Sequence, residues 1–235
     1  MVKDEMVLCF LRSKLHPKCI NSCPLMNERY YEVSNYYRFD DTLPYITELI
    51  TPLYDDRIVS VKRSEAENNP LYVQIVVGLI VKCKNTYLLL KCTNGDMKSH
   101  TTLIEGHVNI PKESNDMFMI TLPNEVMREL QEEVESTWLF NSSFIKKSIN
   151  NRGFIFHPKY ITYNNSTPEN ISYYHTGFIY EMVIPDKYYE DFNSDNFWSK
   201  EPDKNEIIFV DKEDLQTTLE NPDNWLAEMI RKPNF

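Results

Sequence analysis

The chain has 235 residues, of which 42% are hydrophobic, and a formal net charge of −10. This length and composition indicate a soluble globular protein with one large domain, or one domain with an elaborated end. The acidic excess argues against a nucleic-acid duplex or an anionic membrane as a partner, because both present negative charge. A small phosphorylated substrate is not excluded, because a bound divalent cation reverses the local charge.

The N-terminal residues and the cysteines predict a cytoplasmic location. The opening MVKDEMVLCFLRSKL holds an apolar run that is too short for a signal-peptide core or a membrane span. An odd and sparse set of cysteines is typical of reduced thiols. The set comprises Cys9, Cys19, Cys23, Cys83 and Cys92. His16, Cys19 and Cys23 have ligand-like spacing, but a structural zinc site needs four protein ligands and no fourth lies nearby in the sequence.

Residues 1–69 are expected to form an N-terminal α+β extension. The pattern predicts strands over 5–15 and 57–63, and apolar residues at helical spacing predict a helix over 43–54. The polar segment SEAENNP, 64–70, is the expected boundary. A second domain is therefore predicted over 70–235.

Strands and helices alternate in this second part, which favours an α/β layer fold. Residues 72–83 are rich in β-branched side chains and predict a buried strand, followed by a turn and a returning strand over 87–93. Further strands are expected within 99–111, 152–164, 171–185 and 205–215, a loop over 112–123, and a final helix over 221–232.

The segment NEVMRELQEEVES, 124–136, is predicted to form an acidic helix. Four glutamates, Glu125, Glu129, Glu132 and Glu133, would span an arc of about 100° on it. Like charges at i,i+4 are unfavourable by a few tenths of a kcal/mol per pair. Two interpretations compete: a solvated acidic face, or a site for a hard cation such as Mg²⁺, which prefers oxygen ligands.

Two motifs favour the cation site. RELQEEV, Arg128 to Val134, resembles the helical half of the Nudix box of MutT-like hydrolases, and GHVN, Gly106 to Asn109, resembles its loop half. The family pattern is a glycine, five residues, Glu, seven residues, then Arg-Glu-apolar-x-Glu-Glu-x-Gly. Here the loop is longer, Glu135 replaces the closing glycine, and Glu113 is the candidate loop glutamate. From about Arg63 onward the chain resembles the predicted MutT-family phosphoesterases, which share a Gly-His-Ile-Asn loop and a stretched box.

This resemblance implies a fold, an activity and a cofactor. The expected fold is an α/β/α sandwich with a mixed β-sheet. The expected activity is cleavage of a diphosphate linkage in a nucleoside-diphosphate-like substrate with Mg²⁺ or Mn²⁺. Glu129, Glu132 and Glu133 would be metal ligands, and the backbone carbonyl of Glu105 or Gly106 would complete the shell. Arg128 would hold the loop by pairing with an acid such as Glu113.

The groups that touch the substrate are less firmly fixed by the motif. The general base would be Glu129 or an acid in a later loop such as Glu169. His107 and His175 could hydrogen-bond a phosphate, although a structural histidine is the more frequent finding. Tyr160, Tyr163, Tyr173 and Tyr174 could stack on a base, although aromatic residues on strands more often pack in the core.

Two alternatives share the fold. A Nudix-fold module could bind a nucleotide as a sensor without cleaving it, which the irregular box favours. An isomerase acting on a prenyl diphosphate would need a catalytic cysteine, for which the sequence offers no convincing candidate. The resemblance also makes a homodimer the expected assembly.

Overall fold

The computed structural model describes residues 5–14, 30–32, 58–95, 98–109, 118–140, 156–163 and 175–218. The helices expected over 43–54 and 221–232 lie outside these residues. The same holds for the cysteine pair Cys19 and Cys23 with its neighbour His16.

The described elements form a large sheet with few helices, in agreement with the α/β class. Their order is β1 (Met6–Leu11), η1 (Arg12–Lys14), β2 (Tyr30–Glu32), β3 (Ile58–Lys62), α3 (Arg63–Ala66), β4 (Tyr72–Cys83), β5 (Thr86–Cys92), β6 (Thr101–Thr102), β7 (Ile104–His107), α4 (Phe118–Glu133), β8 (Val134–Ser136), β9 (Phe156–Tyr163), β10 (His175–Ile184), η4 (Asp186–Asp191), β11 (Phe197–Ser199), β12 (Asn205–Asp211) and α6 (Leu215–Thr218). Within the sheet, the strand order is β12-β5-β4-β10-β9-β2, and β1, β3, β6 and β7 join off this path.

The chain divides into two compact units. The first unit comprises Met1–Val77, Gly106–Glu125 and Pro158–Ile179, and the second comprises the remaining ranges, Gly78–Glu105, Val126–His157 and Tyr180–Phe235. Each unit is described by itself below.

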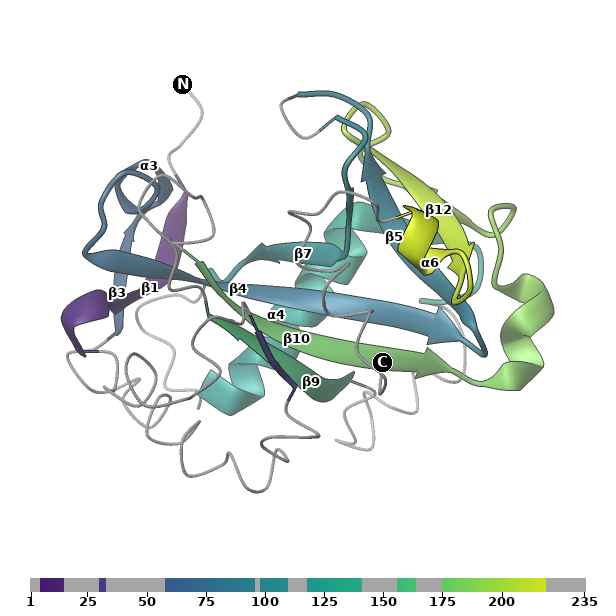
Figure 1. Ribbon diagram of the computed structural model, residues 1–235, viewed down its shortest axis with the longest axis horizontal. Coiled ribbons are helices and arrows are strands. Elements are labelled where there is room, and N and C mark those ends of the chain that lie inside the picture. The colour runs from purple at the N-terminus through teal and green to yellow at the C-terminus, as the bar shows by residue number, and fades with distance from the viewer. Residues whose placement is uncertain are drawn as a thin grey trace. The chain divides into compact units, whose positions relative to one another are not determined.

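In the first unit, β1 bridges β3 and the start of β4. It pairs antiparallel with both, with Cys9 opposite Val59 on one side and opposite Gln74 on the other. Val7 and Cys9 alternate along β1 and are fully buried together with Ala66 of α3. Period-two alternation therefore sends one face of β1 into a small apolar cluster. Figure 1 shows β1, β3 and α3 grouped together.

In the second unit, β5 is the central strand of an antiparallel set. A two-residue turn, Lys84–Asn85, joins β4 to β5, because Cys83 pairs with Thr86. Strand β12 pairs with β5 along its whole length, and Thr86 Oγ1 donates a hydrogen bond of 2.6 Å to Asp211 Oδ1 at one end. The three leucines of β5, Leu88 to Leu90, are buried. Figure 1 shows β5 beside β12, with α6 next to them.

Helix α4 differs from the predicted acidic helix at both ends. It begins at Phe118, within the segment expected to be a loop, and it includes Pro123. It ends at Glu133, so the expected helix over 134–136 is wrong: those residues form β8, which pairs antiparallel with β11. The burial of Val134 and Ser136 on either side of Glu135 has the period of a strand. Tertiary pairing with β11 thus overrides local helix propensity.

Candidate functional site

The carboxylates at the C-terminal end of α4 are placed very differently from one another. Glu129 is 7% exposed, whereas the side chain of Glu132 is 58% exposed. At 100° per residue, Glu133 lies about 40° to one side of Glu129 and Glu132 about 60° to the other. The helix therefore turns Glu129 and Glu133 inward and leaves Glu132 toward solvent.

Arg128 lies between two of the glutamates of the motif. Its Nη2 is 2.5 Å from Glu129 Oε1, and its Nη1 is 2.8 Å from Glu132 Oε2. A guanidinium has donors enough for two carboxylates, and these contacts offset part of the repulsion on the helix. The expected partner Glu113 lies outside the described residues.

Glu133 and Glu105 are partly buried members of the acidic cluster in the second unit. Thr102 Oγ1 donates a hydrogen bond of 2.5 Å to Glu105 Oε1. Burial raises the pKa of both carboxyls, and the charges of Glu105, Glu129 and Glu201 help to raise the pKa of Glu133 to about 9. A hydrogen bond from the Glu105 backbone to the Glu133 carboxyl lowers the pKa of Glu133, but by less than burial and the neighbouring charges raise it.

One oxygen of this cluster is a candidate ligand for a cation. Among the side-chain atoms of the described residues, Glu133 Oε2 is buried and has no hydrogen-bond partner. Leaving a buried oxygen unpaired costs about 1–3 kcal/mol, and more if it is charged. Carboxylates gathered in this way are stabilised either by protons or by a cation.

The carboxylate oxygens of the cluster are ligands of the type that a hard divalent cation prefers, although they are not arranged around a common point. In the described part of the chain, no group of three or more His, Cys, Asp or Glu side chains is arranged to hold a metal ion. Oxygen-only donors, with one buried oxygen unpaired, match the preference of Mg²⁺.

The residues directly after β11 bond to the end of α4 and bring Glu201 to the cluster. The backbone N–H of Lys200 donates to the Glu133 carbonyl at 3.0 Å, and Lys200 Nζ donates to the Gln131 carbonyl at 2.6 Å. These bonds satisfy carbonyls that a helix leaves free at its C-terminus. The pattern along the chain gave no signal for Glu201, because β8 and β11 were not predicted.

In the first unit, the two predicted phosphate-binding histidines meet. His107 Nε2 and His175 Nε2 are 3.3 Å apart, and the ring centroids are 5.4 Å apart. His107 ends β7 and His175 begins β10, so the two come from strands far apart in the sequence. The structure brings the two histidines into contact, and their expected role toward a phosphate stays a prediction.

Glu125 has a role that the sequence did not reveal. It is 9% exposed, and its Oε2 accepts a hydrogen bond of 3.0 Å from the backbone N–H of Asn109. The predicted acidic face counted Glu125 with the other glutamates. In the structure it secures the residue that closes the GHVN motif, within the first unit.

Several predicted residues cannot be placed. Glu169 lies outside the described residues, as do Tyr173 and Tyr174. The backbones of Tyr160 and Tyr163 lie in β9, but their side chains are not described. Gly106 lies in β7 directly after Glu105, and it is partly exposed.

Three cysteines lie in the described part of the chain. Cys83 and Cys92 occupy the two strands of the β4–β5 hairpin as expected, and both are free thiols, like Cys9.

None of the helices in the described ranges has the length and apolar character needed to cross a membrane.

Comparison with known proteins identifies the fold. No family model and no curated protein matches the chain. The structure is similar to that of Tm1382, a proposed Nudix hydrolase, with a TM-score of 0.61 and 17% identity, covering 96% of this chain and 98% of that one. A NUDIX hydrolase from Nitrosomonas europaea matches with a TM-score of 0.40 and 15% identity, covering 69% of this chain and 80% of that one. An Ap4A hydrolase from C. elegans matches with a TM-score of 0.38 and 13% identity, covering 68% of this chain and 93% of that one. The likeness to Tm1382 confirms the expected Nudix fold, and at this identity it shows the fold alone.

Proposed function

We propose that this chain, which has the Nudix fold, is a divalent-cation-dependent hydrolase that cleaves a diphosphate linkage in a nucleoside-diphosphate-like substrate. The observation that best supports the proposal is the buried carboxyl of Glu133. Its Oε2 lacks a partner, and Glu105 and Glu129 surround it with like charge. Such an arrangement is costly for stability and useful for holding a cation.

The residues that would hold Mg²⁺ or Mn²⁺ are those of the motif, with one addition. Glu129 and Glu133 lie on the inward face of α4, and Glu105 adds a third carboxylate within the second unit. Glu132 belongs to the proposed set through the sequence motif, together with the backbone carbonyl of Gly106. When bound, the cation neutralises charge on phosphoryl oxygens and activates water.

The remaining roles belong to positioning and proton transfer. Arg128 orients Glu129 and Glu132 through its two ion pairs. His107 and His175, in contact in the first unit, would donate hydrogen bonds to a phosphate group. Glu129 or Glu169 would act as the general base, since a base must accept a proton from the attacking water.

The proposal is tested by hydrolysis of a panel of nucleoside-diphosphate compounds with Mg²⁺ or Mn²⁺. We expect turnover by the wild type, loss of turnover with EDTA, and a decrease in kcat of about a hundredfold or more for Glu133→Gln. Glu132→Gln measures whether the exposed glutamate is also required. Glu206→Gln, a change in β12 outside the motif, is the matched control and should keep wild-type activity.

One observation favours the sensor function as the second candidate. Arg128 already engages two of the carboxylates that the motif assigns to the cation. Tight nucleotide binding without turnover, measured by calorimetry across the same panel, would establish the sensor and exclude the hydrolase.

A further inference from the structure

The GHVN segment, Gly106–Asn109, is fixed in the first unit by backbone bonds on two sides. The N–H of Val108 donates to the Ile75 carbonyl of β4 at 3.0 Å, and the Val108 carbonyl accepts from the Leu8 N–H of β1 at 3.0 Å. Val108 is fully buried. A strand of the N-terminal extension therefore supports a segment of the proposed site directly.

Two carboxylates of different origin hold Asn109, the last residue of the segment. Glu125 of α4 accepts a hydrogen bond from its backbone N–H, and Glu5, at the start of the extension, accepts one from its side-chain Nδ2. Hydrogen bonds to ionised carboxylates are roughly twice as strong as those between neutral groups. Asn109 is thus anchored through both its backbone and its side chain.

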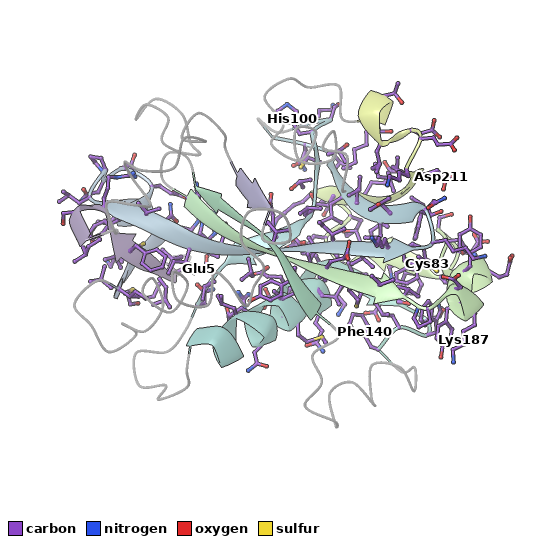
Figure 2. The ribbon with its side chains drawn as sticks, turned by 60° about the horizontal axis from the view of Figure 1, so that its bottom comes forward. Glu5, Cys83, His100, Phe140, Lys187 and Asp211 are labelled. Carbon is purple, nitrogen blue, oxygen red and sulfur yellow. The ribbon has the colours of Figure 1, made fainter. Side chains whose placement is uncertain are left out.

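Glu5 is itself held by Arg63. Arg63 Nη1 is 3.3 Å from Glu5 Oε2, and the Arg63 N–H donates to the Glu5 carbonyl at 2.8 Å. Partial burial acts to raise the pKa of Glu5, but the hydrogen bonds from Asn109 and Arg63 outweigh it and lower the pKa. Glu5 is therefore a charged acceptor at neutral pH, and Figure 2 labels it.

We propose that Glu5 is a positioning residue that holds the GHVN segment in place through Asn109, so that the N-terminal extension forms part of the functional site. This inference rests on the proposed function, which assigns the GHVN segment to the site of diphosphate cleavage. Asn109 follows His107 by two residues, so an anchored Asn109 restricts the backbone that presents the His107 ring to His175. Loss of the anchor would loosen that presentation without removing any group that touches substrate.

The experiment compares four single variants in the full chain. Glu5→Ala removes the acceptor for Asn109, Glu5→Gln keeps an oxygen acceptor, and Asn109→Ala removes the donor. Glu67→Ala is the matched control, because Glu67 also pairs with Arg63, at 2.8 Å, and is equally exposed at 43%. Hydrogen exchange is measured at the Asn109 amide, with the Leu89 amide in β5 as a reporter of global opening.

We expect Glu5→Ala and Asn109→Ala each to accelerate exchange of the residue-109 backbone N–H by about tenfold. That N–H donates to Glu125, and it opens more often once the side-chain bond to Glu5 no longer restrains the backbone. A double variant that combines Glu5→Ala with Asn109→Ala should add little to either single change, because both remove the same contact. Glu5→Gln should restore exchange to within about threefold of wild type, and Glu67→Ala and the Leu89 amide should stay near wild type. The same two variants should lower kcat/KM about tenfold with the same rescue.

Three outcomes of the hydrogen-exchange measurement would overturn the proposal. They are unchanged exchange at Asn109 in Glu5→Ala, an equal effect of Glu67→Ala, and a uniform acceleration that includes Leu89 and is not rescued by Glu5→Gln. Faster exchange with unchanged kcat/KM in an active enzyme would also exclude a role for Glu5 in the site. If the wild type hydrolyses no diphosphate compound, the proposed function fails, while exchange at Asn109 still decides the role of Glu5.

Discussion

Glu133 has an environment unlike that of an ordinary surface glutamate. Burial raises its pKa to about 9, with the charges of Glu105, Glu129 and Glu201 acting in the same direction. In the unfolded chain the same carboxyl has its ordinary pKa of 4.5. The folded state therefore binds a proton that the unfolded state has already released at neutral pH.

This difference predicts a pH dependence of stability. A raised folded-state pKa contributes stability that is fully present below pH 4.5 and is lost as pH rises through about 9. In EDTA, the free energy of unfolding of the wild type should fall by up to about 1.4 kcal/mol per pH unit in that window relative to Glu133→Gln. Urea denaturation of both proteins at pH 5, 7 and 9 measures the difference. A constant difference across the three pH values would contradict the assigned environment of Glu133.

The C-terminus of helix α4 differs from that of the sequence motif, because a strand follows the helix directly. Its inner face carries Leu122, Val126 and Leu130, all buried, at helical spacing. Instead of a glycine that turns the chain, strand β8, Val134–Ser136, follows the helix directly. Lys200 then supplies the hydrogen bonds that the last carbonyls require.

Removal of this cap should therefore weaken the helix end. Lys200→Met keeps most of the aliphatic chain but loses the Nζ bond to the Gln131 carbonyl and the half-exposed ion pair with Glu135 at 3.4 Å. We expect about 1 kcal/mol of destabilisation, mainly from the lost bond to the helix end. Lys204→Met is the control, because Lys204 is 65% exposed and pairs only at the surface with Glu201. Chemical denaturation of both variants checks the prediction. Equal losses in the two proteins would exclude a capping role for Lys200.

At the scale of the whole molecule, a cation and the fold stabilise each other if the acidic cluster is its binding site. A ligand that binds only the folded state adds stability in proportion to the logarithm of its saturation. The expected homodimer and the division at residue 69 remain predictions at this scale. The likeness to Tm1382, over 96% of this chain, concerns the fold alone and does not test either prediction.

Thermal unfolding tests this coupling. With Mg²⁺ at about a hundredfold excess over its Kd, the wild type should gain about 2.7 kcal/mol, equivalent to a rise in Tm of about 5–10 °C. A double variant, Glu129→Gln with Glu133→Gln, should show no Mg²⁺-dependent rise. Glu206→Gln should respond like the wild type. An equal rise in the double variant would place Mg²⁺ elsewhere on the protein.

The sequence by itself determined the fold class and most strands. Periodicity and β-branched content placed β4, β5 and β12, because these signals are local and set by burial on a pleated surface. The Nudix resemblance placed the acidic residues on α4, because a helical motif fixes which side chains share a face.

Only the tertiary structure decided which glutamates turn inward and what they meet. Glu105, Glu201 and Glu125 gained their roles through contacts across long sequence separations, which no local pattern encodes. The end of α4 and the existence of β8 likewise depend on pairing with β11. Local propensity is worth only tenths of a kcal/mol per residue, so packing and strand pairing override it wherever the two conflict.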